Sequence, residues 1–293
     1  MVDRASAGAI GEPFTLWVET GKIREYARAI YSGHPDHFGD NPVSPPHFLA
    51  TRAHWETDRS DVFRLMDMDP SRGLHAGQVF EFVGPPPAAG TRLTAQSRID
   101  SIYDKRSARS GLMTFVDVVT EFRNQRNEIA ARMNTLSVEV EAVSAPEPTN
   151  ISAPAPATEP PYLEKGPAAL EIGPITRTDL VRFAGASGDF NPVHHDEPYA
   201  RAAGYGSTLA MGMFQAGIGA TWATDWLGPR NVRRAEVRFM GRMFPGDRVV
   251  AQGGITRRFE QDGARMLEVQ ALCSNQRGEV TIRNTLTFVD PGA

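Results

Sequence analysis

Two stretches of this chain carry the same short sequences in the same order, and a sequence that occurs twice is expected to fold twice. The run NQRNE at residues 124–128 returns about 150 residues later as NQRGE at residues 275–279, and NTL at residues 134–136 returns at residues 284–286. Looser matches pair residues 23–30 with 180–187, 79–82 with 236–239 and 89–91 with 245–247. Their common order indicates a gene duplication followed by fusion.

A segment rich in proline and alanine separates the two copies. Residues 144–161 hold few charged side chains and show neither helical nor strand periodicity, which is typical of a semi-rigid, extended linker. The 293 residues are enough for two domains of ordinary size. We therefore predict an N-terminal domain over residues 10–143 and a C-terminal domain over residues 162–293, joined by this linker.

The composition favours a small-molecule partner. Hydrophobic residues make up 41% and charged residues 23%, both ordinary for a soluble globular protein, and a net charge of -4 argues against a dedicated nucleic-acid partner. Cys273 is the only cysteine, which excludes an intramolecular disulfide and a thiolate metal cluster. Neither a signal peptide nor an apolar run of membrane-spanning length is present. We expect a cytoplasmic protein with no membrane insertion.

Both copies share one predicted plan: a short amphipathic helix, a loop, a longer helix and then several strands. In the second copy, TRTD at residues 176–179 resembles a capping box and opens a helix through Gly185. Residues 209–227 are apolar nearly all round, which predicts a helix enclosed by other structure. Strand patterns follow at residues 235–239, 248–259, 266–274 and 280–289. An antiparallel sheet wrapped around one central helix satisfies this order.

The loop between these two helices carries an acid and an imidazole. Within SGDFNPVH at residues 187–194, Asp189 and His194 lie five positions apart. Asn191 should be extended, because a residue before proline is pushed out of the α region. The two side chains can then face one point and perform general acid/base chemistry on a small substrate. The alternative is structural, with Asp189 beginning an Asx-turn and His194 capping a surface loop.

The second copy resembles the MaoC-like, R-specific enoyl-CoA hydratases, also called the hydratase 2 family. The family motif is an aromatic residue near a Ser-Gly-Asp-x-Asn-Pro-hydrophobic-His run, followed by a small residue six positions on. This chain has Phe183, the run at residues 187–194 and Ala200. The family's His-Gly-Met element corresponds to MGM at residues 211–213, and its strand motif ending in Pro-Gly-Asp to residues 238–247. The resemblance covers residues 170–290, and residues 10–143 more weakly.

The resemblance implies an α+β class and the hot-dog fold, in which an antiparallel sheet wraps a long helix. The two copies together are expected to form a double hot-dog: two antiparallel sheets, each wrapped around a central helix, packed as a pseudo-dimer. The first copy departs from the motif, because Ser32 or Gly33 stands about where the aspartate should be and GDNPVS at residues 39–44 has serine in place of histidine. We predict a non-catalytic N-terminal domain. Its helix equivalent, near residues 46–63, is short and polar, which by analogy leaves room for a long or bulky acyl chain.

The activity implied is reversible hydration of trans-2-enoyl-CoA to (R)-3-hydroxyacyl-CoA, which in reverse is a 3-hydroxyacyl-thioester dehydratase. His194 is the better base for water, because an unperturbed imidazole titrates near pH ~6.5. Asp189, if buried, would have a raised pKa and could hold or relay the proton that C2 receives. The two are assigned as a dyad, and which of them protonates C2 stays open.

Further residues are assigned to support this dyad. Gly212, near the start of the central helix, can offer its backbone N–H to the thioester oxygen as an oxyanion hole, or can simply mark close helix–sheet packing. Asn191, Ser187 and Gly188 are assigned supporting and positioning roles.

The resemblance also bears on partners and cofactors. It implies an acyl-CoA substrate, no cofactor beyond the CoA carried by that substrate, a homodimer and a place in fatty acid metabolism. HHDE at residues 194–197 invites a metal site, but adjacent side chains point apart and we predict none. Arg233, Arg234 and Arg238 could meet the CoA phosphates, or form a solvated face.

Alternative functions stay open. Within enzymes they are an acyl-carrier-protein dehydratase, a hydratase of dicarboxylic mesaconyl-type CoA thioesters, or a thioesterase. Outside enzymes the alternative is an acyl-CoA-binding or partner hot-dog subunit, which an intact Asp189/His194 pair disfavours. Acyl chain length, branching and physiological direction are not predicted.

Overall fold

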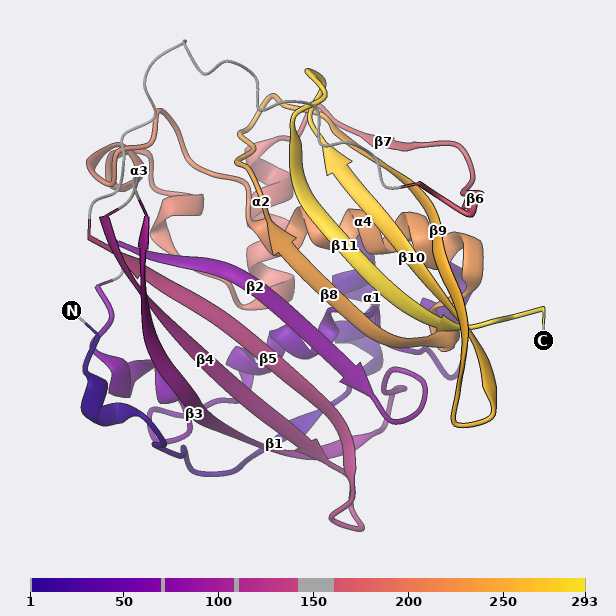
Figure 1. Ribbon diagram of the computed structural model, residues 1–293, viewed down its shortest axis with the longest axis horizontal. Coiled ribbons are helices and arrows are strands. Elements are labelled where there is room, and N and C mark those ends of the chain that lie inside the picture. The colour runs from indigo at the N-terminus through magenta and orange to yellow at the C-terminus, as the bar shows by residue number, and fades with distance from the viewer. Residues whose placement is uncertain (1, 70–71, 108–110, 142–160, 293) are drawn as a thin grey trace.

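The computed structural model describes residues 2–69, 72–107, 111–141 and 161–292 (Figure 1). Residues 144–160 of the predicted linker lie outside the described residues. We call the described parts before and after this segment the N-terminal half and the C-terminal half.

Eleven strands of the described residues form one sheet, with the order β1-β3-β4-β5-β2-β8-β11-β10-β9-β6 and β7 paired to β9. The N-terminal half supplies β1 (Phe14–Trp17), β2 (Gly73–Phe82), β3 (Arg92–Ser107), β4 (Gly111–Arg123) and β5 (Ile129–Val140). The C-terminal half supplies β6 (Glu164–Lys165), β7 (Leu170–Ile172), β8 (Val232–Phe239), β9 (Val249–Gln261), β10 (Ala264–Ser274) and β11 (Val280–Val289). Every described pairing is antiparallel, and the four strands predicted in the second copy correspond to β8–β11.

The longer helices lie together on one face of this sheet (Figure 1). The described α-helices are α1 (Thr20–Ala29), α2 (Arg177–Ser187), α3 (Glu197–Ala202) and α4 (Gly212–Leu227). Short 3-10 helices occur at Arg4–Ser6, Pro35–His37, Phe48–His54, Val62–Met66, Pro192–His194 and Pro229–Asn231. Helix α2 runs to Ser187, two residues beyond its predicted end, and α4 starts at Gly212 instead of residue 209.

Helix α4 is the central helix that the apolar run at residues 209–227 predicted. It contacts β8, β9, β10 and β11, and nearly all of its side chains are buried. A helix that is apolar all round has no face suited to water, so it is stable only when the sheet encloses it. The C-terminal half therefore has the predicted arrangement of a sheet wrapped around one helix.

The N-terminal half lacks such a helix. The predicted short, polar helix near residues 46–63 is replaced by the 3-10 helices Phe48–His54 and Val62–Met66. Between them, Ser60 Oγ accepts the N–H of Thr57 at 2.7 Å, and Asp61 accepts the N–H of Phe63 at 2.9 Å. Short polar side chains that bond nearby backbone groups compete with a helix. The expectation of a central helix in both sheets is thus corrected for this half.

The internal repeat is visible as an approximate twofold symmetry. Strands β2 and β8 pair with each other, and Val79 lies opposite Glu236, the residue that the repeat aligns with it. This pairing joins the two predicted sheets edge to edge. Away from the sheet, the aligned aromatics Tyr26 and Phe183 pack with ring centroids 5.6 Å apart.

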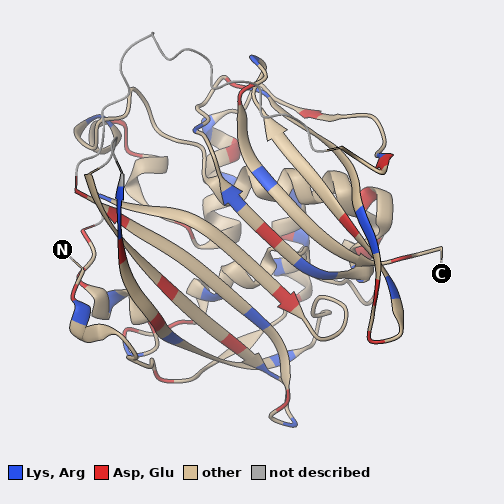
Figure 2. Ribbon diagram, viewed as in Figure 1, with Lys and Arg blue, Asp and Glu red and all other residues tan. Residues whose placement is uncertain are grey.

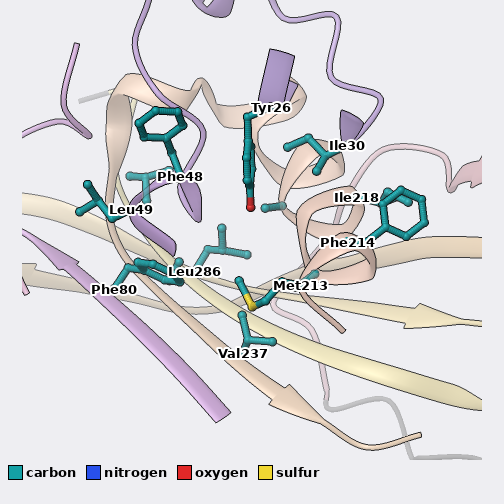
Figure 3. Packing of buried hydrophobic residues seen from close by; sticks show 14 of the residues in the cluster. Tyr26, Ile30, Phe48, Leu49, Phe80, Met213, Phe214, Ile218, Val237 and Leu286 are labelled. Atoms are coloured by element: carbon teal, nitrogen blue, oxygen red, sulfur yellow. The ribbon is translucent and has the colours of Figure 1, made fainter. Parts of the chain in front are cut away.

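The hydrophobic core is shared between the halves. Figure 3 shows Tyr26, Phe48, Leu49 and Phe80 of the N-terminal half gathered beside Met213, Phe214, Val237 and Leu286 of the C-terminal half. Because buried apolar area is the main stabilising term in folding, each half depends on the other for part of its stability. In the described part of the chain, none of the helices is long and apolar enough to cross a membrane.

Candidate active site

A cavity of about 800 Å³ lies between the two halves. From the C-terminal half its lining includes Ser187, Gly188, Asp189, Asn191, His194, Gly212, Phe239 and Arg242. From the N-terminal half its lining includes Arg52, Phe63, His75, Gln78, Thr135 and Ser137. All the site residues predicted from the sequence therefore line one cavity, together with several mostly polar residues of the N-terminal half.

Helix α2 delivers Asp189 to this cavity. The predicted capping box is present, because Thr176 and Asp179 each accept the other's backbone N–H. The helix is capped after Ser187 by Gly188, whose φ of 84° is in the left-handed region where glycine has no steric penalty. The Oγ of Ser187 then accepts the N–H of Asp189 at 3.2 Å. Gly188 and Ser187 thus form the turn that holds Asp189, and their supporting role in catalysis stays a prediction.

Asn191 shapes the turn that follows. Its φ of -58° and ψ of 125° are extended, as the following proline predicted. The side-chain Oδ1 accepts the N–H of Val193 at 3.1 Å and so begins the 3-10 helix Pro192–His194. The backbone N–H of Asn191 donates to Asp189 Oδ1 at 3.3 Å. Asn191 therefore connects the acid to the helix that carries the imidazole.

Asp189 and His194 do come together. The Nδ1 of His194 lies 2.9 Å from the carbonyl oxygen of Leu209. A carbonyl can only accept, so Nδ1 carries the hydrogen and the lone pair of the neutral ring is on Nε2. This Nε2 lies 3.6 Å from Asp189 Oδ2, too far for a direct hydrogen bond but within reach of a bridging water.

The surroundings of the two side chains differ. The side chain of His194 is 13% exposed, whereas that of Asp189 is 40% exposed. The prediction for Asp189 depended on a buried carboxyl, and that burial is not found. The acid instead lies on the cavity wall, on the turn that follows the end of α2.

Gly212 is the first residue of α4, so its N–H has no partner within the helix. It also marks close packing, since a Cβ built at this position would lie 2.4 Å from Cε1 of Phe239. The geometry at Gly212 is thus compatible with both alternatives, an N–H donor at the cavity and close packing of the helix on the sheet. No side chain caps the start of α4 by a hydrogen bond among the described residues, and Gly212 lines the cavity, so the partial positive charge of the helix N-terminus lies at the cavity wall.

The contribution of the N-terminal half to the cavity wall was not predicted. His75 on β2 lines the cavity, its Nε2 lies 2.9 Å from Gln78 Oε1, and its ring centroid lies 4.6 Å from that of Phe239. The protein around the imidazole lowers the pKa of His75, while the Asp189 carboxylate acts in the opposite direction. The sequence signal that could have indicated this wall is the pair of polar residues, His75 and Gln78, in a strand whose Phe80 and Phe82 are buried in the core.

Two models of protein families match the chain. The MaoC like domain matches residues 162–273, and the FAS1-like dehydratase domain region matches residues 5–133. A curated relative, the (R)-specific enoyl-CoA hydratase of Rhodospirillum rubrum, is 32% identical over 96 residues, which cover 32% of this chain and 67% of that protein. The chain belongs to the MaoC-like dehydratase family.

Solved structures confirm the fold of this MaoC-like protein. A MaoC-like dehydratase, 23% identical, superposes with a TM-score of 0.78 over 98% of this chain and 99% of the other. A protein of Mycobacterium tuberculosis described as a double hot-dog fold, 13% identical, superposes with a TM-score of 0.63 over 97% of this chain and 96% of the other. The predicted α+β double hot-dog is confirmed, with the two sheets joined through β2 and β8.

Of the two alternatives for Arg233, Arg234 and Arg238, the structure supports the charged surface and not a place in the cavity. Figure 2 shows residues of both charges along the strands of the sheet. On β8, Arg234 and Arg238 both bond Glu236. Arg233 donates to backbone carbonyls, and none of these three arginines lines the cavity. The exposed Arg242, whose guanidinium lies 4.9 Å from the ring centroid of Tyr205, does line it.

The HHDE run does not gather into a metal site. His195 Nε2 lies 3.2 Å from the carbonyl oxygen of Phe190, Asp196 caps α3, and Glu197 pairs with Arg177 and Arg201. No group of three or more His, Cys, Asp or Glu residues in the described segments could hold a metal ion.

Proposed function

We propose that this MaoC-like protein catalyses the reversible hydration of trans-2-enoyl-CoA to (R)-3-hydroxyacyl-CoA. The observation that carries the proposal is the 3.6 Å approach of Asp189 Oδ2 to His194 Nε2 on the wall of a cavity that also contains the start of α4. The R configuration rests on the relative from Rhodospirillum rubrum, whose name states that specificity.

The dyad holds and activates the water. A water bridging Nε2 of His194 and the carboxylate of Asp189 donates one proton to Nε2, and its oxygen forms a bond to C3 of the enoyl group. The electron pair of the double bond moves toward C2 and the thioester carbonyl. The dyad then returns the proton to C2, so one water is added and no other reactant is consumed.

The start of α4 stabilises the charge that develops on the thioester oxygen. The N–H of Gly212 has no partner within the helix, so it can donate to the thioester oxygen. One preorganised donor of this kind is typically worth about 3 kcal/mol in the transition state. Gly212 is therefore the oxyanion donor in this proposal.

The CoA moiety supplies binding energy away from the reacting atoms. Arg242 is exposed, lines the cavity and makes no ion pair with a described carboxylate, so we assign it to the CoA phosphates. No cofactor is needed beyond the CoA of the substrate. The homodimer and the cytoplasmic location stay predictions, which gel filtration with light scattering and cell fractionation would test.

The test follows loss of the conjugated enoyl-thioester absorbance on short, long, branched and steroid-like trans-2-enoyl-CoA esters, with chiral analysis of the product. We expect the R product and its loss in Asp189→Asn and His194→Ala. Release of free CoA thiol would instead indicate a thioesterase. Binding of acyl-CoA without turnover of any ester would indicate a carrier or partner subunit.

A further inference from the structure

The N-terminal wall of the cavity carries four polar side chains on two neighbouring strands. In the register of β2 and β5, His75 lies opposite Ser137, and Gln78 lies opposite Thr135. A bulge between His75 and Gly77 places His75 and Gln78 on the same face, and all four side chains line the cavity. We call these four residues the polar strip.

Hydrogen bonds fix the orientation of the polar strip. The amide nitrogen of Gln78 donates to the carbonyl oxygen of Asn134 at 2.8 Å, so its Oε1 points the other way. That oxygen accepts from Thr135 Oγ1 at 3.2 Å and lies 2.9 Å from His75 Nε2. Since Oε1 can only accept, the hydrogen of the neutral imidazole is on Nε2, and Nδ1 is the acceptor of the ring.

Ser137 is the member of the polar strip with an unused hydrogen-bond donor among the described residues. Among the described residues, none forms a hydrogen bond with the hydroxyl of Ser137, although the residue is nearly buried and faces the cavity. Beside it, the oxygen of Thr135 can still accept. The polar strip therefore offers one donor and several acceptors to whatever occupies this part of the cavity.

A plain hydrocarbon chain fits this wall poorly. It would remove water from the polar strip without replacing the lost hydrogen bonds, and sites built to bond a hydroxyl discriminate strongly against analogues that lack it. A ligand hydroxyl both donates and accepts, so it matches Ser137 and Thr135 together.

The charges nearby favour a neutral group over a carboxylate. Arg52, the cation that lines this half of the cavity, pairs with the buried Glu56 and lies over the ring of Phe63. Asp189 adds a negative charge to the same cavity, and the surrounding protein lowers the pKa of His75, which disfavours a cationic imidazole there. A carboxylate would meet no unpaired cation among the described residues of this wall.

We propose that the polar strip binds a hydroxyl group of the acyl chain, and that the preferred substrate is an enoyl-CoA hydroxylated beyond its reacting double bond. This inference rests on the proposed hydratase function, which it narrows from any enoyl-CoA to one class. It assigns Ser137 and Thr135 as specificity-determining residues outside the catalytic dyad.

The experiment compares trans-2-decenoyl-CoA with analogues that carry a single hydroxyl at successive carbons beyond C4, and with one that ends in a carboxylate. We expect at least one hydroxylated ester to exceed the plain ester in kcat/KM by about tenfold or more. A preference for the plain ester or for the carboxylate over every hydroxylated ester would overturn the proposal.

The variants Ser137→Ala and Thr135→Val test the assignment directly. Each should lower the ratio of kcat/KM for the hydroxylated over the plain ester by about fivefold to tenfold. The matched control is Thr120→Val, which removes a buried hydroxyl that pairs with Ser97 Oγ at 2.9 Å outside the cavity, and should leave the ratio unchanged. An equal loss on both esters in Ser137→Ala would show that its hydroxyl does not select the substrate.

Calorimetric binding of the same acyl-CoA esters separates this inference from the proposed function. If no ester is turned over, the hydratase function fails, and the polar strip is then judged by affinity alone. Tighter binding of a hydroxylated ester that Ser137→Ala abolishes would support the polar strip even in a carrier, and equal affinities would contradict it.

Discussion

The two halves build the same turn after their first helix, but only the turn of the C-terminal half starts with an acid. In the C-terminal half, Asp189 accepts the N–H of Asn191 at 3.3 Å, and in the N-terminal half Ser32 accepts the N–H of His34 at 3.4 Å. A 3-10 helix follows in each half, Pro192–His194 and Pro35–His37. The backbone of the turn therefore survives the loss of the carboxylate.

The imidazole is also kept in both halves. His37 Nδ1 lies 2.7 Å from the carbonyl oxygen of Val43, much as His194 Nδ1 lies 2.9 Å from that of Leu209. In the N-terminal half, however, Ser32 and His37 are both buried and line no part of the cavity. The comparison teaches that an acid and access to the cavity distinguish the candidate active copy, while the fold of the turn does not.

The largest expected effect on activity comes from replacing Asp189, compared with replacing Ser32 at the matching position of the N-terminal half. Asp189→Asn should lower kcat/KM by about 10²-fold to 10⁴-fold, because a positioned acid or base typically contributes that much. Ser32→Ala, at the matching position, should change kcat/KM by less than about threefold, since no substrate reaches it. The assay is loss of enoyl-thioester absorbance, and comparable losses in both variants would mean that the N-terminal turn takes part in catalysis.

The next prediction uses two glycines of α4. A Cβ at Gly212 would lie 2.4 Å from Phe239, and a Cβ at Gly217 would lie 2.4 Å from Ile30 of the other half. Both Gly212→Ala and Gly217→Ala should therefore destabilise the fold by about 1–3 kcal/mol through overpacking.

Their effects on catalysis should differ. Gly212→Ala forces its methyl group against Phe239, which also lines the cavity, and so shifts the N–H that would bond the thioester oxygen. We therefore expect kcat/KM to fall by about 10²-fold, whereas Gly217→Ala should leave it nearly unchanged at temperatures where both variants are folded. Thermal unfolding and the absorbance assay measure the two effects. Equal activity in the two variants would remove Gly212 from the oxyanion hole.

The sequence was sufficient wherever a local pattern decides the structure. The apolar run of α4, the capping box of α2 and the extended residue before Pro192 depend on neighbours within a few positions, and each was predicted. His75 was not, because strict alternation puts residues 75 and 78 on opposite faces, and only the bulge in β2 brings them together. The shared sheet was also missed, since the pairing of β2 with β8 joins strands far apart in the sequence.

The arrangement of the N-terminal half shows a second limit of sequence reasoning. Residues 46–63 were expected to form a helix because they correspond to the central helix of the C-terminal half. Local hydrogen bonds to the side chains of Ser60 and Asp61 favour short 3-10 helices there instead. The shape of the cavity follows from that replacement and from the packing of both halves. The shape of the cavity therefore cannot be predicted from the sequence of one half alone.

A third prediction concerns a buried imidazole of the N-terminal half. Both ring nitrogens of His47 lack a hydrogen-bond partner among the described residues, and burial lowers its pKa from 6.5 to about 3. Between these values the unfolded chain binds a proton that the folded protein does not, so stability is lost as pH falls below about 6.5. The loss is about 1.4 kcal/mol per pH unit.

His47→Leu removes this proton uptake. We expect urea unfolding at several pH values between 6.5 and 4 to show that the unfolding free energy falls less steeply with pH in the variant than in the wild-type protein. The difference between the two slopes should be about 1.4 kcal/mol per pH unit. The wild-type protein and the variant should converge in pH dependence above pH 7. Parallel curves across the acid range would show that His47 does not titrate on unfolding.

The smallest expected effect compares the repeated NQR turns. Asn124 Oδ1 accepts the N–H groups of Arg126 and Glu128, and Asn275 Oδ1 accepts those of Arg277 and Glu279. Removing such a turn-forming side chain typically costs about 1 kcal/mol. Asn124→Ala should show that loss in urea unfolding.

The C-terminal turn has an additional connection. Its Gln276 donates to Asp247 Oδ1 at 2.8 Å, and the carbonyl of Asp247 accepts the N–H of Ile175, the residue before the cap of α2. In the N-terminal half, Thr91 stands at the position of Asp247 and makes no such side-chain bond among the described residues. Asn275→Ala should therefore cost about 1 kcal/mol more than Asn124→Ala and should also lower kcat/KM by a few fold, because α2 holds Asp189. If the two variants lose the same stability and keep full activity, the turn is only a shared scaffold, and the position of the acid is set by the cap at Thr176 and by Gly188 alone.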